Sequence, residues 1–135
     1  MKVIESSCFN NINNDSVALA IGAFDGLHIG HRAIINRTRE IAAEKGLCSG
    51  VFTFKPHPLK IINPEKAPLS IISNKQKKDI LNEMGVEYLF EQVFTHEFSR
   101  MAFEDFIFQV LINQLKVKHI IVGDDFKFGY QGRGN

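Results

Sequence analysis

The sequence predicts an α/β fold in which helices cover a parallel sheet. Strand-like apolar segments alternate with amphipathic helical patterns along the chain, and glycine or proline marks most of the boundaries. The spacing fits strand–helix–strand units, which are right-handed and require a parallel sheet covered by helices. Four strands and three helices are expected to alternate, beginning and ending with a strand.

The first unit is centred on a glycine-rich turn. Residues 16–21 are short and apolar and end at Gly22, which is typical of a buried strand. A helical pattern starts near Gly30 and stops at Gly46. One face of that helix is expected to carry Ile34, Thr38, Ile41 and Ala42.

The second strand and helix are expected on either side of a surface loop. Residues 49–54 form the strand, which Pro56 and Pro58 end because proline cannot donate to a ladder. Residues 59–72 are expected to form a loop. Asn74 is the expected cap of a helix over residues 75–84, which Gly85 stops.

The last third of the chain predicts a strand, a long helix and a final strand. Residues 86–90 form the third strand and residues 119–122 the fourth. Between them an apolar stripe with a helical period is formed by Phe103, Phe106, Ile107, Val110, Leu111 and Leu115.

Length and composition indicate one ordinary globular domain. The chain has 135 residues, of which 44% are hydrophobic and 23% charged. Its net charge of +1 argues against nucleic acid as a partner, because nucleic-acid binders usually carry a strong basic excess. No apolar run approaches the ~20 residues that span a bilayer, so no membrane partner is expected. No secretory signal is evident. Cys8 and Cys48 are expected to be reduced thiols in a cytoplasmic protein.

The turn at residues 22–31 is the first candidate site. His28 and His31 are three residues apart and share a face if the helix begins near them, while Gly30 lets a ligand approach closely. Two imidazoles at a helix N-terminus suit a phosphate-rich ligand. Asp25 could orient an imidazole or help to bind a metal. The alternatives are turn glycines with surface histidines, or a zinc site, although no third ligand has an obvious spacing.

Two further segments follow strands at the same expected edge, where open parallel sheets bind ligands. In residues 52–58, Phe54 or the prolines could stack on a planar ring, or Phe52 and Phe54 could simply be core residues. In residues 123–129, Asp124 and Asp125 could bind a ribose hydroxyl, a ring edge or a metal, or belong to an ordinary turn.

Together the three segments resemble a known family. Residues 22–31, Gly-Ala-Phe-Asp-Gly-Leu-His-Ile-Gly-His, are similar to the signature of the His-x-Gly-His nucleotidyltransferases. The segments Phe54-x-Pro56-His57-Pro58 and Val122-Gly123-Asp124-Asp125-Phe126-x-Phe128-Gly129 narrow this to the adenylyltransferase domain of prokaryotic FAD synthetases, which are bifunctional riboflavin kinases and FMN adenylyltransferases. The resemblance implies a Rossmann-like nucleotidyltransferase fold.

The resemblance also implies a reaction in which FMN and ATP give FAD and pyrophosphate with Mg²⁺, which is expected mainly through the ATP phosphates. It assigns His28 and His31 to phosphate stabilisation and catalysis. The implied ATP site adds Gly22, Ala23, Phe24, Asp25 and Gly30, and the implied flavin site consists of Phe54, Pro56, His57, Pro58 and Asp125. Ala23 is a departure, because family members often have Asn there. The expected partners are the small molecules ATP and FMN.

The family continues beyond Asn135 with a strand, a helix and a Ser/Thr-rich stretch whose arginine contacts ATP. Residues 1–135 are therefore expected to be an incomplete adenylyltransferase domain, truncated at the C-terminus, with the riboflavin kinase domain absent. One alternative is a weak or inactive nucleotide- or flavin-binding fragment. Another is a related nucleotidyltransferase with a different phosphorylated acceptor, such as phosphocholine, glycerol phosphate or phosphopantetheine.

Overall fold

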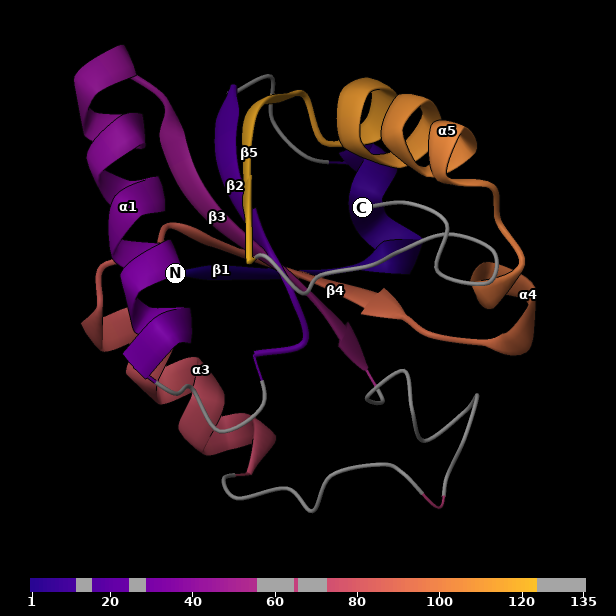
Figure 1. Cartoon of the computed structure of the whole chain (residues 1–135), viewed down its shortest axis with the longest axis horizontal. Helices are drawn as coiled ribbons and strands as arrows, with labels where there is room; N and C mark the ends of the chain where they lie inside the picture. The colour runs from indigo at the N-terminus through magenta and orange to yellow at the C-terminus, as the bar shows by residue number, and fades with distance from the viewer. Residues whose placement is uncertain (12–15, 25–28, 56–64, 66–72, 124–135) are drawn as a thin grey trace.

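The computed structural model describes residues 1–11, 16–24, 29–55, 65 and 73–123 (Figure 1). A five-stranded sheet runs through this part of the chain in the order β1-β4-β3-β2-β5. Every pair of neighbouring strands is parallel, which confirms the predicted parallel sheet. The strands are β1 (Lys2–Glu5), β2 (Val17–Ile21), β3 (Cys48–Lys55), β4 (Tyr88–Val93) and β5 (Val117–Val122).

The bounds of β2 and β3 agree with the prediction to within one residue, and the other three strands depart further from it. Strand β1 was missed, because an edge strand with three exposed residues carries almost no apolar signal. Strand β4 spans Tyr88–Val93 instead of residues 86–90. It starts later because Val86 is buried in the turn and donates its N–H to the Leu81 carbonyl. Strand β5 begins two residues earlier than predicted, at Val117.

Helices cover both faces of the sheet (Figure 1). The helices α1 (Ile29–Lys45) and α3 (Asn74–Glu83) lie on one face. The 3-10 helix η1 (Ser6–Asn11) lies on the other face with the continuous segment formed by α5 (Phe103–Asp105) and η4 (Phe106–Gln114), and the short α4 (His96–Ser99) precedes that segment. The predicted stops are confirmed: Gly46 and Gly85 follow α1 and α3 with φ of +65° and +85°. Among the described residues, no helix is long and apolar enough to cross a membrane.

The predicted cap of α3 was wrong by one residue. Ser73, not Asn74, is the N-cap, and its hydroxyl accepts from the Gln76 N–H at 3.1 Å. The Gln76 side chain accepts in return from the Ser73 N–H at 2.8 Å, which completes a capping box. Either residue type caps helices well, so the choice depended on where the chain enters the helix.

The last helical segment is wider than the predicted α-helix. In η4 the hydrogen bonds reach five residues back, as in the bond from the Leu115 N–H to the Val110 carbonyl. Phe106, Val110, Leu111 and Leu115 are buried as predicted. Ile107 is partly buried, and the side chain of Phe103 lies outside the described structure.

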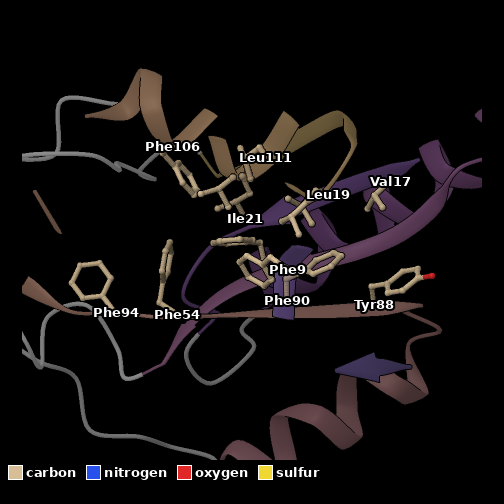
Figure 2. Close-up of a cluster of buried hydrophobic side chains, with 13 residues drawn as sticks. Phe9, Val17, Leu19, Ile21, Phe54, Tyr88, Phe90, Phe94, Phe106 and Leu111 are labelled. Atoms are coloured by element: carbon tan, nitrogen blue, oxygen red, sulfur yellow. The ribbon is translucent and has the colours of Figure 1, made fainter. Parts of the chain in front are cut away.

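The strands divide the core into two layers, because alternate side chains point to opposite faces. The larger layer lies beneath η1 and η4 and is rich in phenylalanine (Figure 2). It contains Phe9, Val17, Leu19, Ile21, Phe52, Phe54, Tyr88, Phe90, Phe94, Phe106, Val110, Leu111 and Leu115. The smaller layer faces α1 and α3 and contains Ala20, Phe24, Ile35, Val51, Leu81, Val86 and Leu89.

Candidate functional site

The direction in which the chain crosses the sheet reverses at β2. From β2 the chain moves through α1 to β3 and then to β4, whereas β5 returns to the other side of β2. The connections that lead to β3 and to β5 therefore run to opposite sides of β2. Open α/β sheets bind ligands at such a point, outside the carboxyl ends of the strands. Gly22 follows β2 directly and Gly123 follows β5, so two of the three candidate segments begin at this point.

The turn at residues 22–24 is held by hydrogen bonds from two elements, β3 and α3. The Gly22 N–H donates to the Phe52 carbonyl of β3 at 3.1 Å. The Ala23 carbonyl accepts from the Thr53 hydroxyl at 3.0 Å and from Lys77 Nζ of α3 at 3.3 Å. Hydrogen bonds thus fix the backbone on both sides of Ala23.

Phe24 adopts an uncommon backbone conformation within this turn. Its φ is +51°, in the left-handed region that bulky residues rarely occupy, and its side chain is only 2% exposed. The ring lies over Gly22, where an added Cβ would come within 3.2 Å of the ring carbon Cζ. A side chain at position 22 would displace the ring, so Gly22 makes room for Phe24.

His31 lies in the first turn of α1 and packs against Phe24. The ring centroids are 5.4 Å apart with an angle of 88° between the planes, an edge-to-face contact. The first turn of α1 contains no acidic side chain. The N–H groups at a helix start lack intrahelical acceptors and favour an anion, and the His31 imidazole belongs to this first turn.

Gly30 is a glycine that the fold does not require. It is exposed, it does not have a positive φ, and a Cβ there would meet nothing within 4 Å. Helix propensity favours alanine over glycine. The close approach of a ligand remains as a physical reason for glycine at this position.

Phe54 lies at the end of β3, on the face of the sheet opposite to Phe24. It is 8% exposed and belongs to the phenylalanine-rich layer (Figure 2). Phe52 is 0% exposed in the same layer, so both residues are core residues. Its ring contacts those of Phe94 and Phe98 at 5.7 Å and 6.1 Å between centroids. A flat ligand would therefore reach the margin of this cluster rather than a freely exposed ring.

The other residues of the predicted site lie outside the described structure. These are Asp25, His28, Pro56, His57, Pro58, Asp124 and Asp125. Within the part of the chain that is described, no group of three or more His, Cys, Asp or Glu side chains could hold a metal ion. Cys8 and Cys48 are both free of disulfides, as predicted.

Sequence analysis did not single out Thr53, Lys77 or Glu91. Alternation along β3 places Thr53 opposite to Phe52 and Phe54, which is a usable signal for a polar contact on the α1 and α3 face. Glu91 is the register partner of Thr53 and is 1% exposed, and Lys78 Nζ lies 3.6 Å from its Oε1. Nothing local distinguishes Lys77 from its neighbours, because its partner Ala23 is 54 residues away.

A family model described as FAD synthetase matches residues 10–135. The chain belongs to the FAD synthetase family. It is 37% identical over 117 residues to the bifunctional riboflavin kinase/FMN adenylyltransferase of Bacillus subtilis (strain 168), covering 86% of this chain and 37% of that protein. A protein of the same name from Escherichia coli (strain K12) is 36% identical over 121 residues, which is 90% of this chain and 39% of the relative.

This member of the FAD synthetase family spans less than half the length of the curated relatives named here. The share is 43% for the relative from Buchnera aphidicola subsp. Acyrthosiphon pisum (strain APS), which is 33% identical over 136 residues and aligns with 100% of this chain. The fold is also similar to a crystal structure described as a macrolide-efflux protein from Streptococcus pneumoniae. That alignment has a TM-score of 0.83 and 25% identity, and it covers 99% of this chain and 52% of the other.

Proposed function

We propose that this chain is an FMN adenylyltransferase, which transfers AMP from ATP to FMN and yields FAD and pyrophosphate. The observation that carries the proposal is the turn at the end of β2, where Phe24 packs on His31 and a Cβ added at the exposed Gly30 would meet nothing within 4 Å. The relatives named as riboflavin kinases and FMN adenylyltransferases support the choice of acceptor.

The chemistry requires no protein nucleophile. An oxygen of the FMN phosphate attacks the α-phosphorus of ATP in line. A new phosphorus–oxygen bond forms, and the bond from the α-phosphorus to the bridging oxygen of the β-phosphate breaks, releasing pyrophosphate. His31 and His28 donate hydrogen bonds to phosphate oxygens as negative charge develops, and the N-terminal N–H groups of α1 add to this stabilisation. The contribution of the protein is positioning and charge stabilisation.

The flavin is proposed to lie beside the end of β3. Pro56, His57 and Pro58 would border it, the margin of the Phe54 cluster would contact it, and Asp125 would hold substrate after β5. Strand β3 is the neighbour of β2, so in this proposal FMN and ATP lie next to each other at the carboxyl ends of these two strands. Mg²⁺ would be held mainly by the ATP phosphates, where it neutralises charge on the phosphates.

The proposal extends to location and domain content. A cytoplasmic location agrees with two cysteines that are free of disulfides. Residues 1–135 are assigned to adenylyl transfer alone, because their three motifs resemble only the adenylyltransferase domain of the family. Riboflavin phosphorylation is not proposed for these residues.

The test is FAD formation from FMN, ATP and Mg²⁺, followed by chromatography, with calorimetric titrations of ATP and FMN in parallel. FAD formation that depends on ATP and is abolished in His31→Ala, but not in His96→Ala at an exposed histidine of α4, would support the assignment. Binding of ATP and FMN without turnover would instead identify a binding fragment. Turnover only with phosphocholine, glycerol phosphate or phosphopantetheine would reject FMN as the acceptor.

A further inference from the structure

The carbonyl oxygen of Ala23 receives two side-chain hydrogen bonds from distant parts of the chain. Thr53 donates from β3 at 3.0 Å, and Lys77 donates from α3 at 3.3 Å. A carbonyl oxygen has two lone pairs and can accept both bonds at once. Lys77 is half-buried, and a hydrogen bond donated by a lysine ammonium is stronger than one between neutral groups.

These donors act on the peptide plane that precedes Phe24. The Ala23 carbonyl and the Phe24 N–H belong to the same rigid peptide group, so fixing the oxygen limits the φ rotation of Phe24. That φ is +51°, a conformation that is unfavourable for a bulky side chain and persists only when the surroundings impose it. The hydrogen bond from the Gly22 N–H to the Phe52 carbonyl holds the residue before Ala23. Thr53 and Lys77 constrain the peptide group between Ala23 and Phe24.

The orientation of Phe24 in turn determines what His31 packs against. The two rings meet edge to face with 5.4 Å between their centroids. If the peptide relaxed, the Phe24 ring would leave its place over Gly22 and the imidazole would lose this support. A contact from α3 is thereby linked to a histidine of α1 through one peptide group.

We propose that Thr53 and Lys77 are positioning residues for the nucleotide site: by sharing the Ala23 carbonyl they hold Phe24 in the conformation that orients His31. The inference rests on the proposed function, in which His31 faces the ATP phosphates. Neither residue is assigned a contact with substrate. Their effect is on how well the site is arranged before ATP arrives, which governs affinity and the rate of transfer.

The experiment combines Thr53→Val and Lys77→Met, singly and together, in the full chain. Valine keeps the shape of threonine and removes the hydroxyl, and Thr53→Ser is the matched control that keeps it. Lys75→Met is the control for Lys77→Met, since Lys75 is an exposed lysine of the same helix. Lys77→Arg keeps a charged donor and is expected to restore part of the function.

Two measurements report on the turn. One is the affinity for ATP by calorimetry together with kcat and KM for FAD formation. The other is amide hydrogen exchange in peptides covering residues 18–31, which needs no ligand. Each single variant is expected to weaken ATP binding about 3- to 10-fold, the effect of one net hydrogen bond, and to speed exchange at residues 22–31. FMN affinity is expected to stay the same.

The double variant separates positioning from general stabilisation. Either donor alone still satisfies the carbonyl, so the double variant is expected to lose more ATP affinity than the product of the two single effects. Effects that multiply independently, or variants whose exchange and ATP affinity match those of Thr53→Ser and Lys75→Met, would overturn the inference. If Lys77→Met does not fold, Thr53→Val decides the question.

Failure of the proposed function would look different. The wild-type chain would then form no FAD, while exchange at residues 22–31 would still respond to Thr53→Val and Lys77→Met. Normal FAD formation by the wild type, with unchanged exchange in both variants, would reject only the role of the two donors.

Discussion

Phe24 meets His31 edge to face, with an interplanar angle of 88°, and so joins the end of β2 to the start of α1. The contact pairs a buried ring in a strained backbone conformation with a side chain at a helix N-terminus. A mobile imidazole would be a poorer hydrogen-bond donor to a phosphate, because preorganised donors stabilise developing charge best. The pair therefore connects the packing of the core to the proposed chemistry.

Phe24→Leu is expected to lower the free energy of unfolding by about 1–3 kcal/mol, since it removes buried area and an aromatic contact. It should also weaken ATP binding more than FMN binding, because His31 loses its support. Urea denaturation and calorimetry measure the two effects. Phe9→Leu, at a ring equally buried on the other face, is the control and should cost stability without a selective loss of ATP affinity. Equal behaviour of the two variants would argue against a special role of Phe24.

Gly30→Ala is expected to separate folding from ligand binding. The added methyl group meets open space and should leave the free energy of unfolding unchanged or raise it by about 0.5–1 kcal/mol. ATP affinity should fall about tenfold or more, as expected when a methyl group is forced into a close contact. The opposite change at a neighbouring exposed position, Ala33→Gly, should lower stability and spare ATP binding. Unchanged ATP affinity in Gly30→Ala would show that no ligand approaches this helix turn.

His28→Ala is expected to depress turnover far more than flavin binding. Under the proposed function, loss of one donor to a developing charge is expected to lower kcat by about 10²–10³-fold, while the flavin ring is proposed to bind beside the end of β3. Steady-state FAD formation and an FMN titration give the two quantities. His96→Ala serves as the control at an exposed histidine. Equal losses in turnover and FMN affinity would count against the phosphate role.

Ser73→Ala is expected to destabilise the start of α3. Loss of the capping hydroxyl should lower the free energy of unfolding by about 0.5–2 kcal/mol. Lys77 lies in the first turns of this helix, and its N–H donates to the Ser73 carbonyl, so fraying should also weaken ATP binding. Denaturant titration is the measurement, and Asn74→Ala is the control. A larger loss from Asn74→Ala would show that Asn74 caps the helix after all.

Lys78→Met is expected to cost more stability than Glu91→Gln. Glu91 is 1% exposed, neither of its carboxylate oxygens has a hydrogen-bond partner in the described structure, and Lys78 Nζ is 3.6 Å away. Removing the lysine leaves a buried charge uncompensated, at a cost of about 1–3 kcal/mol, whereas the amide removes the charge itself. Urea denaturation compares the variants, with Lys75→Met as the control. A greater loss from Glu91→Gln would mean that the carboxylate stabilises the fold in its own right.

Local signals in the sequence were sufficient for much of the fold. The strand at Val17–Ile21 and the helix stops at Gly46 and Gly85 depend on apolar runs and on backbone conformations available to glycine. The parallel sheet followed as well, since each crossover between strands had the length of a helix. The candidate segment at residues 22–31 could be located because glycines and histidines cluster directly after a strand.

Long-range packing decided the rest. The sequence by itself determined four of the five strands in the described structure, the helices that connect them and where a phosphate site could lie, because these depend on neighbouring residues. Only the tertiary structure placed β5 beside β2, buried Phe54 among other phenylalanines, and brought Lys77 to a carbonyl 54 residues earlier. Such contacts depend on the order of strands and on the docking of helices, and no local periodicity encodes either.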